Sequence, residues 1–437
     1  MKAIFFQRWR KFTCTAAVLV GLFGCAPVWA QVSLPPVDSR PLGGILDELE
    51  RDIGGLPADA ERRLGSLRQE VIGELARRNR AELQRDPHGE LIVRGEITAF
   101  SPSPQALAGA RAAGFTVLRE RSLEGLDARI VVFQVPARQS LRRALRRLQR
   151  LDPEGIYDFN HVYLPVGGMR PAGPEEMAAG QPATDLPAST SVRVGLVDGG
   201  IASDHPSLRE ATIQARGCDG TQVPSAHGTA VASLLVGRDE HFRGAAPGGT
   251  LLAVDIYCGR ATGGAADAFA DALAWLAGEG VGVINTSIVG PPNRVLEQAV
   301  RAVAARGHLI VAAVGNDGPA ARPLFPAAYV GTLGITGVRA DQRVLPEAGR
   351  GPHVDFAAPG ADMLAAGPNA GYAEVRGTSY ASPLVAGLLA AAIGQPDPEA
   401  VQVAIAALAA VAIDLGRKGR DEVYGEGLVA ESLRVTP

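Results

Sequence analysis

Apolar residues before position 87 recur with helical spacing. In two stretches they return every three or four positions, with Arg and Glu between them: Leu46, Leu49 and Ile53, then Leu64, Leu67, Val71 and Leu75. This spacing predicts two amphipathic helices within residues 31–86. The basic residues that follow, Arg77, Arg78 and Arg80, are interpreted as a solvent-facing surface, and nothing in this segment carries chemistry.

Between residues 87 and 165, strand-like and helix-like stretches alternate. Composition predicts strands over 91–100, 115–119, 130–135 and 157–163, and helices after Ser103 and Ser140, over 104–113 and 140–151. The order strand–helix–strand–strand–helix–strand is that of a small ferredoxin-like α+β module. Residues 166–190 are rich in Gly, Pro, Ala and Thr, which predicts a linker and a natural place for a processing cut.

From residue 191 to residue 437, short apolar strands alternate with helices. Strands are predicted over 194–197, 251–256, 283–286, 309–314 and 330–335, and helices over 265–276 and 294–305. This alternation predicts an α/β domain with a parallel sheet covered on both faces, in which sites form at the carboxyl ends of strands. A stretch over 401–413 is apolar almost all round and is predicted to be a buried helix.

The first thirty residues have the pattern of an export signal. Basic residues precede an apolar run over 12–23, and Val28-Trp29-Ala30 then places small residues before a cut at Gln31. The run is too short to span a bilayer, so no transmembrane span is expected. The alternative is a lipoprotein signal with an acylated Cys25, which Phe23 fits poorly. Either interpretation places the protein in the periplasm or outside the cell.

Composition and charge narrow the class of protein. The chain is 46% hydrophobic and 20% charged, as expected for a globular protein of two or three folding units. The net charge of -3 predicts neither a nucleic-acid partner nor binding to an acidic membrane surface. Outside the signal only Cys218 and Cys258 remain, and an oxidising compartment favours a disulfide over two separate buried thiols. No Cys or His cluster suggests a metal site.

Four polar residues of the α/β domain are candidates for chemistry. Asp198 ends a strand in VGLVDGGI, and His227 opens a helix of small residues in SAHGTAVASLLVG. Ser379 lies in RGTSYASPLVAG at the start of another helix, where free N–H groups favour negative charge. Asn316 follows a strand in IVAAVGNDG. Each alone has a structural explanation as a turn residue, a cap or a packed histidine.

Together these motifs, in the order Asp, His, Asn, Ser, resemble those of the subtilisin family, the subtilases. The resemblance runs from about Val192 to Val429 and includes GAAPGGTLLAVDIY, INTSIVG, VDFAAPG and GRDEVYGEGLV. It implies a subtilisin-like α/β catalytic domain and a serine endopeptidase that acts on proteins or peptides, requires no cofactor and is a monomer. Ser379 would be the nucleophile, His227 the base and then the acid, and Asp198 the group that orients His227. Asn316 and the Ser379 N–H would bind the oxyanion.

The resemblance also implies where substrate lies. Ser287, Ile288, Val289 and Gly290 would form an edge for extended substrate, and Ala313, Val314 and Gly315 would form the other wall of the first specificity pocket. Val289 stands where the family commonly has Gly, and Val314 adds bulk. A narrow pocket that disfavours large aromatic residues is therefore predicted. Ser207 stands where many subtilases place an Asp that binds structural Ca²⁺, so calcium is not assumed.

Residues 87–165 stand where subtilases have a propeptide. The resemblance implies that this module assists folding, that it then inhibits, and that IYDFNHVYLP leads its tail into the active site. Cleavage is expected between about Tyr163 and Val192. A catalytically silent binding or scaffold protein, possibly anchored at Cys25, is the main alternative. An esterase is disfavoured, since no G-x-S-x-G surrounds Ser379.

Overall fold

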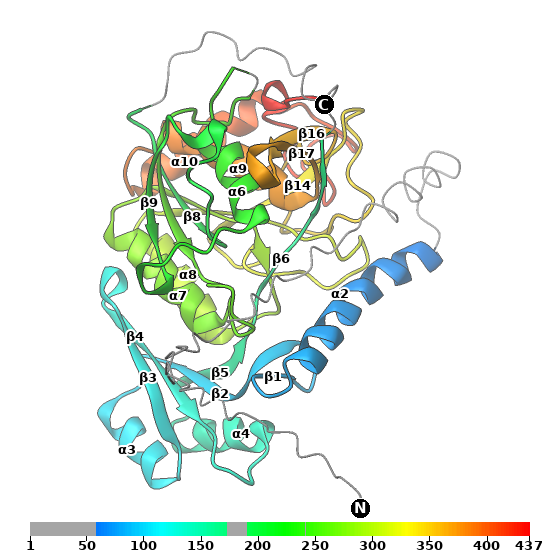
Figure 1. The fold of residues 1–437 in the computed structure, drawn as a ribbon. Helices are drawn as coiled ribbons and strands as arrows, with labels where there is room; N and C mark the ends of the chain where they lie inside the picture. Colours follow the sequence, from blue (N-terminus) through cyan, green and yellow to red (C-terminus); the bar gives the residue numbers. More distant parts are fainter. Residues whose placement is uncertain (1–57, 173–189, 241) are drawn as a thin grey trace, which may run out of the picture. The chain divides into compact units, whose positions relative to one another are not determined.

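The computed structural model describes residues 58–172, 190–240 and 242–437. The predicted export signal, the predicted helix over 46–53 and most of the predicted linker lie outside these residues. The second N-terminal helix is present as α2 (Ala58–Arg78). Figure 1 shows that it precedes an antiparallel sheet, which is followed by a larger parallel sheet.

The N-terminal sheet is antiparallel and has helices on one face. Its strands are β1 (Leu83–Arg85), β2 (Leu91–Phe100), β3 (Thr116–Leu123), β4 (Ala128–Gln134) and β5 (Ile156–His161). Strand β4 lies between β2 and β3, while β1 pairs with Leu91 to Val93 of β2 and β5 pairs with β2 at Ile92 and from Ile97 to Phe100. The helices are α3 (Pro104–Ala112) and α4 (Leu141–Leu151). From β2 to β5 the elements follow the βαββαβ order, and β1 is an additional strand before it.

The two faces of this sheet pack against different partners because side chains alternate along a strand. On β4, Val131 and Phe133 belong to the core beneath α3 and α4. Ile130 and Val132 belong instead to a core shared with Phe269, which lies on α7 of the parallel-sheet domain. The module is therefore joined to the larger domain by buried apolar contact.

The larger sheet is parallel throughout, with strand order β15-β14-β13-β11-β8-β10-β9. Its strands, in chain order, are β8 (Arg193–Asp198), β9 (Thr212–Arg216), β10 (Thr250–Asp255), β11 (Val283–Thr286), β13 (Leu309–Ala313), β14 (Thr332–Val338) and β15 (Phe356–Pro359). Helices α6 (Ala226–Val236) and α9 (Thr378–Ala392) share one core, and α7 (Ala266–Gly278) and α8 (Arg294–Ala305) share another. The predicted parallel α/β fold is confirmed.

Short elements complete the described chain. Strands β16 (Met363–Ala366) and β17 (Tyr372–Arg376) pair with β7 (Gly168–Pro171), and β6 (Leu164–Pro165) pairs with β12 (Ile288–Val289). The single-turn 3₁₀ helices are η1 (Glu124–Leu126), η2 (Pro206–Leu208), η3 (Cys218–Gly220), η4 (Pro368–Ala370) and η5 (Glu431–Leu433). Strand β6 ends the predicted N-terminal module, whereas β7 lies in the segment expected to be a linker, and both pair with strands of the larger domain.

The C-terminal helix α10 (Pro398–Val411) is not buried as predicted. Val401 and Ala404 are covered, but Val403 is 63% exposed and Val411 73% exposed. The prediction was wrong because an apolar composition does not require two packed faces, and this helix lies at the edge of the domain with one face against α9. Across the residues that the structure describes, no helix is long and apolar enough to cross a membrane.

Candidate active site

Asp198 and His227 are brought together by the end of one strand and the start of one helix. Asp198 is the last residue of β8, and His227 lies in the first turn of α6, where the Ser225 side chain caps the helix through the Gly228 N–H. His227 Nδ1 lies 2.9 Å from Asp198 Oδ1. Asp198 is 1% exposed, so the pair is shielded from water and its attraction is strong.

Ser379 lies close to this pair, at the start of α9, and is fully buried. Its Oγ donates a hydrogen bond of 2.9 Å to the Ser287 carbonyl oxygen, while Ser287 Oγ donates one of 2.8 Å to the Ser379 carbonyl oxygen. The Tyr380 ring, one residue on, lies 5.7 Å from the His227 ring between centroids. Ser379 Oγ is thus hydrogen-bonded to the edge strand, and no hydrogen bond joins it to His227 among the described residues.

Asn316 offers an unused hydrogen-bond donor at the same place. Its Oδ1 accepts from the Thr378 N–H at 3.1 Å, which fixes the orientation of the amide. Its Nδ2 is buried and has no hydrogen-bond partner among the described residues. A buried N–H without a partner is costly, and such groups in folded proteins usually have a functional reason. A developing oxyanion would supply the missing acceptor.

The chain's own residues 163–166 lie along the edge strand as a substrate would. In the antiparallel pairing of β6 with β12, Leu164 lies opposite Val289 and Pro165 opposite Ile288. Tyr163 holds the tail on the other side, because its N–H donates to the Gly264 carbonyl oxygen at 2.8 Å. Main-chain pairing on both sides fixes the register of this segment in the cleft.

Tyr163 anchors the segment in a closed pocket. Its ring is fully buried, meets the Phe269 ring edge-on at 5.4 Å between centroids, and donates from its hydroxyl to the Pro291 carbonyl oxygen at 2.9 Å. A Cβ on Gly290 would lie only 2.5 Å from the Tyr163 ring, so this position must be glycine. An aromatic side chain three residues before Val166 is therefore tightly bound.

Val166 is the residue that reaches the candidate catalytic groups. Its carbonyl oxygen lies 3.3 Å from His227 Nε2, and its side chain packs with Val289 and Leu324. Burial alone lowers the pKa of His227, but the charge and hydrogen bond of Asp198, with the Val166 carbonyl, raise that pKa above its usual value. Both ring nitrogens face acceptors, which favours the doubly protonated, charged imidazolium.

The chain continues past this point without leaving the cleft. Gly167 and Gly377 approach so closely that a Cβ on Gly377 would lie 2.8 Å from Gly167 Cα. Both have positive φ, at 123° and 138°, which glycine adopts most readily. After them β7 pairs with β17, with Gly168 opposite Arg376. The peptide bond between Val166 and Gly167 therefore lies between two anchored strands.

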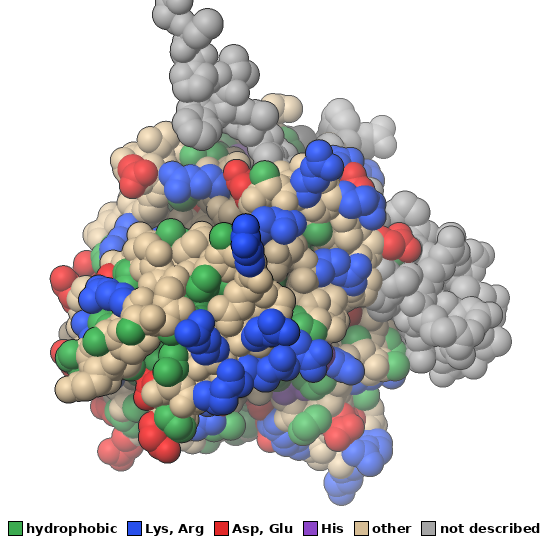
Figure 2. All heavy atoms as spheres, turned by 90° about the horizontal axis from the view of Figure 1, so that it is seen from below, with side chains coloured by type: hydrophobic (Ala, Val, Ile, Leu, Met, Phe, Trp, Pro, Cys, Tyr) green, Lys and Arg blue, Asp and Glu red, His purple; other side chains and the backbone are tan. Residues whose placement is uncertain are grey.

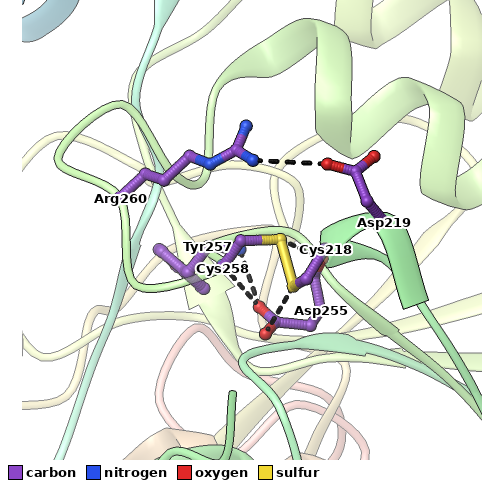
Figure 3. The surroundings of a disulfide bond; sticks show 6 residues. All are labelled: Cys218, Asp219, Asp255, Tyr257, Cys258 and Arg260. Carbon is purple, nitrogen blue, oxygen red and sulfur yellow. Dashed lines mark hydrogen bonds and ion pairs between the residues drawn. A yellow bond between two sulfur atoms is a disulfide. The ribbon is translucent and has the colours of Figure 1, made fainter. Parts of the chain in front are cut away.

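A disulfide links the two loops beside this cleft (Figure 3). It joins Cys218 to Cys258, with Cα atoms 5.2 Å apart and a sequence separation of 40. Asp255 holds the second loop by accepting from the Tyr257 and Cys258 N–H groups at 2.8 and 2.9 Å. Tyr257 in turn donates to the Tyr163 carbonyl oxygen at 3.0 Å, so the disulfide steadies a loop that contacts the bound segment. In the chain-entropy model this link contributes about 3–4 kcal/mol.

Helix α2 covers part of the same cleft. Its Ile72 and Leu75 pack in one cluster with Leu164 and with Ala261 of the larger domain. Its Arg68, 9% exposed, binds Glu90 at 2.9 Å and lies 3.4 Å from Asp317, the neighbour of Asn316. Burial raises the pKa of Asp317 to about 6, although Arg68 counteracts this. The N-terminal helix therefore reaches the loop that carries Asn316, a contact that the sequence did not indicate.

The N-terminal sheet meets the starts of two helices of the larger domain. Asp158 accepts from the Arg294 N–H at 2.8 Å at the start of α8, and Asn160 Oδ1 accepts from the Asp267 N–H at 3.3 Å at the start of α7. Burial raises the pKa of Asp267, but the hydrogen bond and charge of Arg119, 2.8 Å away, outweigh it and lower that pKa. Polar groups thus satisfy both helix ends across the interface.

One predicted wall residue, Val314, packs differently from the prediction. Val314 packs with Ala312, Ala327 and Val354, away from the cluster that contains Val166, so its bulk does not narrow the pocket. The residue that does so is Leu324, which the sequence did not single out. Backbone hydrogen bonds between Gly290 and Phe325 bring the loop after Asn316 against the edge strand, and only this folding places Leu324 there.

The remaining predicted wall residues lie on or next to the edge strand β12 and at or just beyond the end of β13. Ser287 contacts Ser379, and Ile288 and Val289 form β12. Ala313 ends β13, and Gly315, with φ 97°, has room for no Cβ because Leu324 would lie 2.5 Å away.

The neighbourhood of Ser207 offers little to a calcium ion. Ser207 is fully buried and its Oγ lies 2.9 Å from His205 Nδ1, while His205 Nε2 lies 2.8 Å from the Gly371 carbonyl oxygen. In the described residues the one group of three possible ligand side chains is Cys218, Asp255 and Cys258. Two of its three ligand atoms are bonded to each other in the disulfide, so the donor set does not fit a hard cation either.

Comparison with known proteins places this geometry in context. The family model described as the subtilase family matches residues 189–427. The chain is 34% identical over 246 residues to M-protease of Shouchella clausii (strain KSM-K16), over 55% of this chain and 63% of that protein. It is also 34% identical to Subtilisin Savinase of Lederbergia lenta, over 55% of this chain and 89% of that one.

A solved structure, fervidolysin from Fervidobacterium pennivorans, a keratinolytic enzyme related to subtilisin, has a similar fold with a TM-score of 0.65 and 20% identity. The likeness covers 80% of this chain and 61% of fervidolysin. Because the family model matches only residues 189–427, the likeness in fold extends beyond the matched region.

Proposed function

The chain belongs to the subtilase family of serine endopeptidases, and we propose that it is an exported precursor that cuts its own Val166–Gly167 bond. The observation that carries this proposal is the position of Val166. Its carbonyl oxygen lies 3.3 Å from His227 Nε2, while the residues before and after it pair with β12 and β17. Contacts of this kind support a role for this peptide bond as a substrate rather than as part of a connecting loop.

The proposed reaction is acyl transfer through Ser379. His227 takes the Ser379 proton as Oγ attacks the Val166 carbonyl carbon, and the resulting oxyanion accepts from Asn316 Nδ2 and the Ser379 N–H. The C–N bond then breaks, with the proton passing from His227 to the Gly167 nitrogen. Water, activated by His227, hydrolyses the acyl-enzyme and leaves a carboxylate on Val166. Asp198 orients His227 and stabilises its charged form.

Two changes would precede this reaction. Ser379 Oγ must turn from the Ser287 carbonyl oxygen, and His227 must lose the proton that its two acceptors stabilise. The described arrangement is therefore a bound but resting precursor. The buried interface of residues 87–165 with α7 and α8 supports a further role of this module as an inhibitor that stays bound after the cut.

The same geometry supports a preference among peptide substrates. Val289 and Leu324 close the pocket that holds the side chain before the cleaved bond, which favours Val and other small aliphatic residues there. Tyr163 suggests an aromatic residue three positions earlier. We also propose that no calcium ion binds at Ser207, since its hydroxyl is committed to His205.

The test is to express the chain and its Ser379→Ala variant and to sequence the N-terminus of each product. The proposal expects a product that begins at Gly167 and digests casein, and an uncut, inactive variant with an unchanged melting temperature. A third variant, Val166→Asp, keeps every catalytic group but places a charge in the apolar pocket, and should be cut slowly or elsewhere. A mature start before Glu90, or an inactive wild type that stays full length, would favour the scaffold alternative.

A further inference from the structure

Helix α4 presents a dense basic surface on the outer face of the N-terminal module. Five of its 11 residues are arginines, and none is acidic. Together with the preceding loop they form the α4 arginine surface: Arg138, Arg142, Arg143, Arg146, Arg147 and Arg150. All are exposed except Arg147, which is half-buried. In Figure 2, which views the molecule from the side where α4 lies in Figure 1, Lys and Arg side chains gather with few acidic ones among them.

The residues that the structure describes do not neutralise this surface. None of the six guanidinium groups has an ion pair or side-chain hydrogen bond with the described residues. The acidic residue nearest in sequence, Asp152 at the end of α4, instead accepts a hydrogen bond of 2.7 Å from the Tyr157 hydroxyl. Some arginines elsewhere are paired within the chain, as Arg119 is with Glu96 and Asp267. The described residues thus leave the α4 arginine surface available to an anion from outside.

The positions of these arginines also lower the stability of helix α4 itself. Arg142 and Arg146, Arg143 and Arg147, and Arg146 and Arg150 are like charges one turn apart, which destabilises a helix. Arg142 and Arg143 also lie in the first turn, where the helix dipole favours acidic residues. Residues whose local preferences oppose the fold are expected at functional sites.

The α4 arginine surface is shallow, which suits small anionic groups that are presented on a flat surface. A shallow depression of about 580 Å³ is lined by Pro136, Ala137, Gln139 and four of the arginines. Arg138 there has a φ of 98°, which is rare for a residue with a side chain and marks backbone held in place by its surroundings. At the end of the same helix Leu151 is 49% exposed. An apolar side chain beside arginines fits a lipid interface, and neither α4 nor its preceding loop contains an aromatic side chain that would stack on nucleic-acid bases.

We propose that the α4 arginine surface docks the precursor on a membrane surface rich in anionic phospholipid. The net charge of the whole chain concealed this, because acidic residues elsewhere offset a local excess of positive charge. The helix does not insert, since its apolar residues Ala144 and Leu148 are buried against the sheet. The surface lies before Val166, so, if the proposed cut occurs, the peptidase domain separates from its membrane-binding part.

The test uses the full chain with Ser379→Ala, which stays uncut whether or not the chain processes itself. Its binding to vesicles of phosphatidylglycerol and phosphatidylcholine is compared with binding to phosphatidylcholine alone, by co-sedimentation at low and high salt. The triple variant Arg143→Glu, Arg147→Glu, Arg150→Glu removes the surface. A control with the same change in charge, Arg209→Glu, Arg417→Glu, Lys418→Glu, alters exposed residues elsewhere. The parent and both triple variants keep the same N-terminal residues, so a difference in binding between them cannot come from that segment.

The proposal expects binding to anionic vesicles that salt weakens, at least about tenfold loss in the α4 variant and little loss in the control. Circular dichroism and melting of the α4 variant must match the parent, so that a loss of binding cannot come from a loss of fold. Equal binding by both triple variants, or no preference for anionic vesicles, would overturn the proposal. Duplex DNA bound as tightly as vesicles would instead identify a general polyanion site.

Discussion

The Val166 carbonyl oxygen lies 3.3 Å from Nε2 of His227, so the chain's own backbone occupies the nitrogen that would act as the base in the proposed reaction. Asp198 faces the other ring nitrogen at 2.9 Å. Burial lowers the pKa of His227, but together the two acceptors raise it, which favours the charged imidazolium that cannot accept a proton. In the proposed reaction the bound segment would therefore delay its own cleavage, and this predicts how processing depends on pH.

Processing of the precursor should accelerate as pH rises. The pKa of His227 is raised because Asp198 and the Val166 carbonyl together outweigh burial. The folded chain gains stability from the charged ring below the ordinary pKa of 6.5, and this is lost as pH rises through the raised value. Pulse–chase gels across pH should give a half-maximal rate above pH 6.5. A rate that is flat from pH 5 to 8 would contradict the proposed state of His227.

Removing the Asn316 side chain should slow catalysis without preventing binding. Its unpartnered Nδ2 is the proposed donor to the oxyanion, so Asn316→Ala should lower kcat by about 10²–10³-fold, with little change in KM. Because Oδ1 also holds the Thr378 N–H, melting must be measured alongside. Thr332→Ala is a suitable control, since that hydroxyl is also buried without a partner but lies on β14. An unchanged kcat would remove Asn316 from the reaction.

Opening the first pocket should change its specificity. Leu324→Gly or Val289→Gly removes side chains that contact Val166, and should raise kcat/KM for Phe or Tyr before the cleaved bond by about 10- to 200-fold relative to Val. Profiling with a peptide library measures this. Val314→Ala, in a separate cluster, should leave the ranking of substrates unchanged. If the wild type already prefers Phe and Tyr before the cleaved bond, the prediction of a narrow pocket is wrong.

The contact of Arg68 with Asp317 should stabilise the precursor mainly above pH 6. With its pKa raised to about 6, Asp317 contributes stability that is fully present below its usual 3.8 and lost as pH rises through about 6. Above that pH the ionised carboxylate needs Arg68. In the Ser379→Ala background, Arg68→Gln should therefore cost about 1–3 kcal/mol at pH 8 and less at pH 5. Arg77→Gln on the same helix, 72% exposed, is the control. Equal losses at both pH values would exclude Asp317 as the partner.

Chelators should leave stability unchanged if no calcium binds at Ser207. The buried hydroxyl is bonded to His205 and lacks the charge of a carboxylate, so one strong ligand is missing. Thermal unfolding with and without a calcium chelator measures this. A fall of many degrees with chelator would show that calcium binds through other groups.

The sequence by itself determined the features that depend on neighbours in the chain. Period-two and helical patterns gave most strands and helices, including β2 and β8, to within a few residues. Asp198, His227, Asn316 and Ser379 could be singled out because each lies in a short motif at a strand end or helix start. The valine at position 289, where the family commonly has glycine, was likewise visible from the sequence around it.

Only the tertiary structure decided what depends on segments far apart. Leu324 became a pocket wall, and Val314 did not, because a loop folds back against β12. Arg68 met Asp317 across 249 positions of sequence (317 − 68), and α10 stayed half-exposed because it lies at an edge. The bond that enters the site was also decided in this way, by pairing on both sides of Val166. Burial, strand register and the choice of contact partner are decided when segments far apart in the sequence pack together. Local sequence patterns determine only which face of each segment is apolar.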